Sequence, residues 1–221
     1  MKILHVSCSP HGATGESSRL ARKIVDLLLE IDPAAAVIER PIGEVPIPAI
    51  DANYAAAQHA FVAEAGHRGS VALSEILIRE LESADAVVIG TPMHNLAVPS
   101  TLKAWIDHVV RARRTFDMTP RGKVGTLRDR PVFVAVASGG FFSGERARQP
   151  DFLTPYLALV LGNIGLTDVT FFSVEGTARD AVLVARAREA AEQKVREFLA
   201  SFALRPASGL QRIVAGQGRI A

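Results

Sequence analysis

The 221-residue sequence has one cysteine, Cys8, and no long uncharged apolar run. A single thiol excludes an intramolecular disulfide framework and a zinc site built from several cysteines. No apolar run reaches the roughly 18 residues that a membrane-spanning helix needs. Residues 2–6 are too short and too polar for the core of a signal peptide. These absences predict a cytoplasmic protein with no membrane partner.

The sequence also has little excess of either sign of charge. Its 25 Lys and Arg residues nearly balance 23 Asp and Glu residues, for a formal net charge of +2. Such a balance gives no argument for a polyanionic partner. Basic residues nevertheless cluster between residues 111 and 130. A basic segment can attract nucleic acid or a phosphorylated small molecule, but no nucleic-acid motif accompanies this one. We therefore interpret it as a solvated loop and predict no nucleic-acid partner.

Strand-like and helix-like segments alternate along the chain. Apolar runs rich in β-branched residues predict strands, and apolar residues at helical spacing predict helices. The predicted strands are residues 2–7, 35–40, 85–91, 131–137 and 169–174. The predicted helices are residues 20–31, 50–67, 74–81, 99–110, 152–164 and 181–202. Parallel neighbours need crossover connections, so this order predicts an α/β fold with a five-stranded parallel sheet and helices on both faces.

Ligands of such folds bind beyond the carboxyl ends of the strands, which directs attention to the three loops at residues 8–18, 91–98 and 137–144. The first loop is rich in Ser and Gly and leads into a helix, as a phosphate site requires. Glu16 would offer its backbone N–H to a phosphate while its carboxylate faces solvent. An ordinary helix N-cap by Thr14 or Ser17 is the alternative.

Two prolines bracket the second loop and stiffen its backbone. Met93 and Leu96 offer apolar contact there, and the Asn95 amide can donate and accept hydrogen bonds, which suits the edge of a heteroaromatic ring. In the third loop, Gly139 and Gly140 allow a ligand to approach the backbone closely. Plain strand-to-helix turns are the alternative for both loops.

Several other kinds of site lack their motifs. The six histidines are scattered without the spacing of metal ligands, so we predict no metal site. No GxSxG turn supports a nucleophilic triad. The GxGxxA string at residues 216–221 ends the sequence and opens no helix, so it does not support a dinucleotide-binding domain of the nicotinamide type.

Longer stretches of the chain resemble the FMN-dependent NADH azoreductases, which are flavodoxin-like NADH:quinone reductases. Residues 92–107 are similar to the family pattern PMYNFxIPxxLKxxxD, and residues 111–116 to its RxGxTF segment. Residues 154–169 resemble TPYLxxxLGFIGITDV. The resemblance covers residues 2 to about 200. It implies a single flavodoxin-like domain over residues 1–203 with the strand order 2-1-3-4-5, followed by an extension at residues 204–221.

The resemblance also implies an FMN site and an activity. The family segment that holds the phosphate maps onto Ser9, Gly15, Glu16 and Ser17. The segment over the flavin ring maps onto Met93, His94, Asn95 and Leu96. The segment near the far edge of the ring maps onto Ser138, Gly139 and Gly140. NADH or NADPH would reduce the flavin, and a quinone or azo compound would then reoxidise it. Gly15, His94 and Leu96 replace a Ser, a Tyr and a Phe of the family, changes that bear on substrate preference.

No side chain is assigned a firm catalytic role, although His94 is a candidate proton donor. A flavodoxin-like electron carrier without its own NAD(P)H-oxidising activity is the main alternative, and a flavin-free binding module is another. Members of the family that the chain resembles form two-fold dimers, so the resemblance implies a homodimer. The candidate interface residues are Trp105, Val109 and Tyr156.

Overall fold

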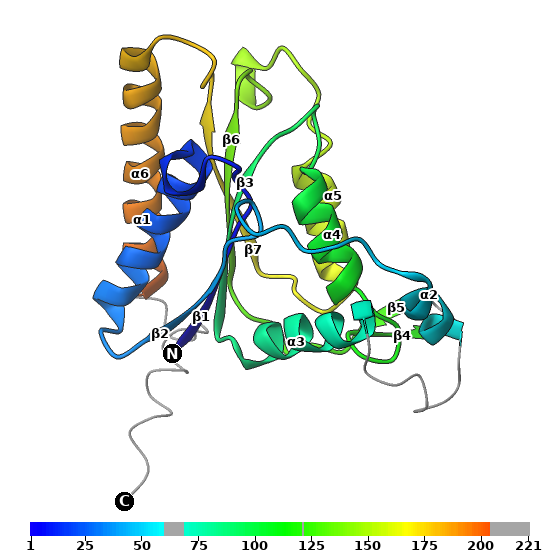
Figure 1. Ribbon diagram of the computed structural model, residues 1–221. Helices are drawn as coiled ribbons and strands as arrows, with labels where there is room; N and C mark the ends of the chain where they lie inside the picture. Colours follow the sequence, from blue (N-terminus) through cyan, green and yellow to red (C-terminus); the bar gives the residue numbers. More distant parts are fainter. Residues whose placement is uncertain (60–68, 121, 204–221) are drawn as a thin grey trace, which may run out of the picture.

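The computed structural model describes residues 1–59, 69–120 and 122–203. Its centre is a parallel sheet of five strands, as expected, in the spatial order β2-β1-β3-β6-β7 (Figure 1). These strands are β1 (Lys2–Ser7), β2 (Ala36–Arg40), β3 (Ala86–Pro92), β6 (Val132–Ser138) and β7 (Val169–Glu175). Among the described residues, no helix is long and apolar enough to cross a membrane. The predicted extension at residues 204–221 lies outside the described residues.

Helices cover both faces of the sheet (Figure 1). On one face lie α1 (Glu16–Ile31) and α6 (Ala181–Ala203), and on the other lie α3 (Gly69–Ser83), α4 (Ser100–Val109) and α5 (Thr154–Gly162). Residues 86–89 of β3 are all apolar because both faces of the strand are covered: Val87 and Ile89 pack into one core, and Ala86 and Val88 pack into the other. A strand that is covered on both faces has no polar side. Of the helix predicted at residues 50–67, the structure describes α2 (Ala52–His59).

The predicted strand order 2-1-3-4-5 needs a correction in its numbering. Two further strands, β4 (Phe116–Thr119) and β5 (Gly122–Gly125), lie between β3 and β6 in the sequence and pair antiparallel with each other. The sheet order in chain numbering is therefore 2-1-3-6-7. The sequence did not reveal these strands because each has four residues, most of them partly or fully exposed, and glycine bounds the second one at both ends.

The interpretation of residues 111–130 as a solvated loop holds for the exposed Arg113, Lys123 and Arg128, but it is wrong for Arg111, Arg114 and Arg130. The guanidinium groups of Arg111 and Arg114 donate to the two carboxylate oxygens of Glu75 on α3, both at 2.9 Å. Arg130 is buried and donates to the carbonyl oxygen of Leu81 at 2.6 Å, near the C-terminal end of that helix. Arg111, Arg114 and Arg130 therefore anchor the segments that flank β4 and β5 to α3.

Two of the three predicted interface residues belong to the chain's own core. Trp105 is 1% exposed and Val109 is 0% exposed, and both pack among the sheet, α3 and α5. They lie on the inner face of α4, where helical spacing alone did not separate a core from an interface. Tyr156 is only partly buried, so it stays a candidate.

Glu75 generates a prediction about acid stability. Hydrogen bonds from Arg114, followed by the charges of Arg114 and Arg111, lower the pKa of Glu75 from 4.5 to about 2. A carboxyl whose pKa is lower in the folded state stabilises the protein above its unfolded pKa, and this stability disappears as the pH falls through the folded pKa. We expect Glu75→Gln to lower the free energy of unfolding at pH 7 by about 1–3 kcal/mol in urea titrations.

The difference between wild type and Glu75→Gln should shrink as the pH falls from about 4.5 towards 2. Glu82→Gln is the matched control, because Glu82 is more exposed and pairs with Arg114 alone. We expect that control to cost less than about 1 kcal/mol. A wild-type advantage that is the same at pH 7 and pH 2.5 would contradict this assignment.

Candidate functional site

The loops after β1, β3 and β6 lie side by side because these three strands are neighbours in the sheet. Two backbone hydrogen bonds join the loops at their bases. The Cys8 N–H donates to the Gly90 carbonyl oxygen at 2.8 Å, and the Met93 N–H donates to the Ala137 carbonyl oxygen at 2.8 Å. All the predicted site residues therefore lie along one edge of the sheet.

The first loop folds back on itself before α1 begins. The Gly12 N–H donates to the Ser9 carbonyl oxygen at 3.1 Å, and the Gly15 N–H donates to the Gly12 carbonyl oxygen at 3.3 Å. Gly12 has a φ of 53°, a conformation that glycine adopts without strain. The N-cap residue of α1 is Gly15, and no side chain caps the helix. The alternative of a plain N-cap by Thr14 or Ser17 is therefore wrong.

The first turn of α1 consequently has free donors. Within the part of the chain that the structure describes, the N–H groups of Glu16, Ser17 and Ser18 have no hydrogen-bond acceptor. Ser17 is 1% exposed, and its hydroxyl has no partner among the described residues either. A Cβ atom on Gly15 would overlap the Ser9 hydroxyl, so that hydroxyl fills the space where the family has a serine side chain. Buried donors at the positive end of a helix fit a phosphate.

The sequence led us to expect that the Glu16 carboxylate faces solvent, and this expectation is wrong. The Arg188 guanidinium on α6 donates to both carboxylate oxygens at 2.6 Å, and Arg19 lies 3.5 Å away. The Glu16 side chain is 16% exposed. Its N–H and its carboxylate therefore serve different partners.

The second loop turns tightly at its tip. His94 and Ala97 exchange two backbone hydrogen bonds of 3.0 Å. The two residues between them have positive φ angles, 49° for Asn95 and 71° for Leu96. Asparagine tolerates this conformation, whereas leucine is strained in it. Within the described residues, the N–H groups of Asn95 and Leu96 have no acceptor, so both are available to a ligand.

The third loop is held from below by Glu175 at the end of β7. Its carboxylate accepts hydrogen bonds from the backbone N–H groups of Phe142 at 2.8 Å and Ser143 at 3.2 Å. The N–H groups of Gly139 and Gly140 find no acceptor anywhere in the described ranges. Both glycines lie at the same sheet edge as the second loop, because β3 and β6 are neighbours.

Sequence reasoning missed Gln149, which links the second and third loops. Its Nε2 atom donates to the Ser138 hydroxyl at 3.1 Å and contacts the Met93 sulfur at 3.2 Å. A Cβ atom on Gly140 would overlap the side-chain amide oxygen of Gln149. No motif contains this glutamine, and only the folded loop brings it to the site. His94 is exposed at the loop surface, and the described residues contain no cluster that could hold a metal ion.

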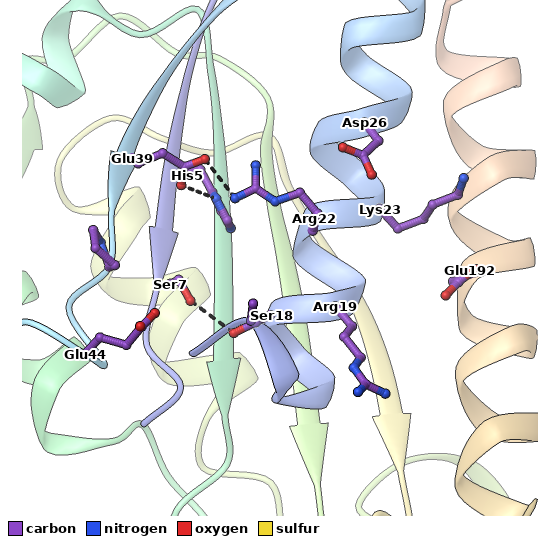
Figure 2. A pocket seen from close by; sticks show the side chains of 12 residues that line it. His5, Ser7, Ser18, Arg19, Arg22, Lys23, Asp26, Glu39, Glu44 and Glu192 are labelled. Atoms are coloured by element: carbon purple, nitrogen blue, oxygen red, sulfur yellow. Dashed lines mark hydrogen bonds and ion pairs between the residues drawn. The ribbon is translucent and has the colours of Figure 1, made fainter. Parts of the chain in front are cut away.

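A pocket of about 350 Å³ lies beside the first loop, between β1, β2 and α1, and its lining includes Ala13 and Ser18 of that loop (Figure 2). His5 is 2% exposed and forms a 2.7 Å hydrogen bond through Nδ1 with Glu39. Burial lowers the pKa of His5 more than the nearby Glu39 raises it. The pocket has no lining residue from the second or third loop, and its mixed charges do not select a dianion. The three loops, not this pocket, bring unpaired backbone donors together at one edge of the sheet.

Comparison with known proteins identifies the fold and the family. Residues 1–199 match the model of a family described as having a flavodoxin-like fold. FMN-dependent NADH:quinone oxidoreductase 5 of Burkholderia lata is 47% identical over 91% of this chain and 94% of its own length. FMN-dependent NADH:quinone oxidoreductase 4 of Pseudomonas fluorescens is 46% identical over 79% of this chain and 84% of its own. An azoreductase structure from Bacillus anthracis covers 89% of this chain and 99% of its own, with a TM-score of 0.73 and 24% identity.

The fold and the family match define the class of the protein as flavodoxin-like. With 47% identity over nearly the full length of a relative, the chain belongs to the family of the relatives named FMN-dependent NADH:quinone oxidoreductases. The azoreductase structure supports the fold alone.

Proposed function

We propose that this chain is an FMN-dependent oxidoreductase that passes two electrons from NADH to a quinone or an aromatic azo compound. The two substrates use the site in turn, so the oxidised nicotinamide leaves before the acceptor binds. The observation that carries the proposal is the set of unpaired backbone N–H groups on three adjacent loops. The names of the relatives supply the cofactor, NADH and the quinone.

The first turn of α1 is the proposed phosphate site. The N–H groups of Glu16, Ser17 and Ser18 point out of the helix end, and the hydroxyls of Ser9 and Ser17 are buried beside them. Together they offer neutral donors and the positive end of a helix dipole. Gly15 leaves the room that Ser9 occupies. These features fit the phosphate of FMN without a direct cationic contact.

The second and third loops are the proposed ring site. Met93, which is 9% exposed, and Leu96 provide apolar contact. The N–H groups of Asn95, Leu96, Gly139 and Gly140 provide donors for the polar edges of the ring. FMN supplies the two-electron chemistry when it is bound. The chain positions the ring, and its fixed donors stabilise negative charge on the reduced cofactor.

The cofactor and the activity have one direct test. The purified protein should be yellow, and mass spectrometry of the released ligand should identify FMN. The flavoprotein should oxidise NADH in the steady state with a quinone present. A colourless protein that FMN cannot reconstitute would refute the proposal. A yellow protein without NADH oxidation would favour an electron carrier. Parallel assays with NADPH, quinones and azo dyes would define the preferred substrates.

Ser17→Asp should weaken FMN binding strongly. The new carboxylate would lie at the end of α1 where the phosphate binds, and a buried charge of the wrong sign repels it. We expect at least about a hundredfold rise in the dissociation constant, measured by flavin fluorescence. Ser17→Ala removes only one hydroxyl and should cost about tenfold or less. A flavin content that matches wild type in Ser17→Asp would place the phosphate elsewhere.

Asn95→Leu should lower turnover more than stability. The substitution replaces a polar side chain beside the ring with an apolar one, and the positive φ of Asn95 adds about 1 kcal/mol of strain. Asn95→Gly is the matched control, because it removes the amide group without that strain. Steady-state rates and thermal unfolding of both variants separate the two effects. Equal turnover and an unchanged flavin spectrum in both variants would remove this side chain from the site.

Assembly into a homodimer is the second part of the proposal. A mostly apolar groove of about 390 Å³ is lined by residues of α4 and α5 and of the segments that follow β2 and α4, namely Ile50, Tyr54, Ala55, Ile106, Asp107, Val110, Tyr156 and Val160. Leu159 on α5 is 68% exposed, and Phe152 just before that helix is 60% exposed. Exposed apolar surface of this kind marks association sites. A second copy on this face would cover the open side of each flavin ring and exclude water from it.

Leu159→Glu should therefore shift the protein toward a monomer in sedimentation velocity experiments. Activity should fall as the dimer dissociates. Ile76→Glu is the matched control, since Ile76 is also an exposed apolar side chain, 53% exposed, but lies on α3. A wild-type protein that sediments as a fully active monomer at assay concentration would contradict the dimer.

A further inference from the structure

We propose that Arg188 on α6 is a positioning residue for FMN, which it serves without contact by neutralising Glu16 and holding its carboxylate away from the phosphate. This inference rests on the proposed function. Glu16 contributes one of the free N–H groups of the phosphate site and also a negative charge in the same helical turn. A phosphate dianion at that turn would meet a carboxylate unless another residue compensated it.

The geometry of the Arg188–Glu16 pair suits this role. Two hydrogen bonds of 2.6 Å join the planar guanidinium to both carboxylate oxygens, so the carboxylate is fixed and not merely attracted. The side chains are only 25% and 16% exposed. Arg188 and Glu16 are 172 residues apart in the sequence, and they connect the two helices that cover one face of the sheet.

A purely structural ion pair would act on the fold and not on the charge of the ligand. Arg19 also approaches Glu16, but at 3.5 Å and with 42% of its side chain exposed, so water screens it more. Arg188 is therefore the cation that decides how much negative charge a ligand meets at the end of α1. The prediction that follows is a selective effect on flavins that carry a phosphate.

The test compares FMN with riboflavin, which has the same ring and no phosphate. Flavin fluorescence would give both dissociation constants for the deflavinated full-length protein and its variants. We expect Arg188→Ala to weaken FMN binding about five- to tenfold and riboflavin binding less than about twofold. Higher salt should reduce the loss of FMN affinity in Arg188→Ala, because it screens the charge of the Glu16 carboxylate that Arg188 no longer neutralises.

The double variant Glu16→Gln/Arg188→Ala should regain the FMN affinity of wild type, because the charge that Arg188 neutralises is gone while the Glu16 N–H remains. Glu44→Gln is the matched control, since Glu44 follows β2, its carboxylate lies beside Gly12 of the first loop, and no described ion pair joins it to Arg188. In the double variant Glu44→Gln/Arg188→Ala, the effects of the two substitutions on FMN binding should add, without any rescue. Arg196→Ala, which removes another cation from α6, should leave FMN binding unchanged.

An equal loss of FMN and riboflavin affinity in Arg188→Ala, or no rescue by Glu16→Gln, would overturn the role of Arg188. Thermal unfolding of the apoproteins identifies a variant that fails to fold, and Arg188→Lys then repeats the comparison with a smaller change in shape. A wild-type protein that binds riboflavin and FMN equally would overturn the inference but leave a flavin enzyme. A wild-type protein that binds neither flavin would overturn the proposed function itself.

Discussion

Backbone donors without acceptors are the constraint on which the site depends. A buried N–H group needs a partner, and a parallel sheet cannot supply one where its strands end. The order β2-β1-β3-β6-β7 brings three such ends together. Of the N–H groups without an acceptor at residues 16–18, 95–96 and 139–140, those of Ser17 and Ser18 belong to buried residues, and the others are open to a ligand or water. The proposed FMN would accept hydrogen bonds from all three groups at once.

Side chains from distant segments hold these loops in place. Glu175 at the end of β7 fixes the third loop through two backbone N–H groups, and Gln149 joins that loop to Met93 in the second. Arg188 on α6 restrains the only carboxylate in the first turn of α1. The strained φ of Leu96 persists because Ala97 and His94 close the turn around it. The loops are therefore preorganised donors, a property that binding and charge stabilisation both use.

The sequence predicted the sheet because buried parallel strands are apolar on both faces, as β3 and β6 are. It placed the three loops correctly for the same reason, since a loop that follows such a strand must lie at the carboxyl edge. It failed at β4 and β5, whose short exposed strands lack an apolar pattern, and at Arg111 and Arg114, whose partner on α3 is 36 to 39 residues away. Gln149 and Arg188 were missed because only tertiary contacts give them a role.

Hydrogen exchange of the backbone amides with and without FMN tests the central claim most directly. We expect FMN to slow exchange at residues 16–18, 95–96 and 139–140, because the ligand becomes the acceptor for those N–H groups. Amides that line the His5 pocket and lie away from the first loop should exchange at unchanged rates. Protection around His5, Arg22 and Glu39 with none on the three loops would contradict the account.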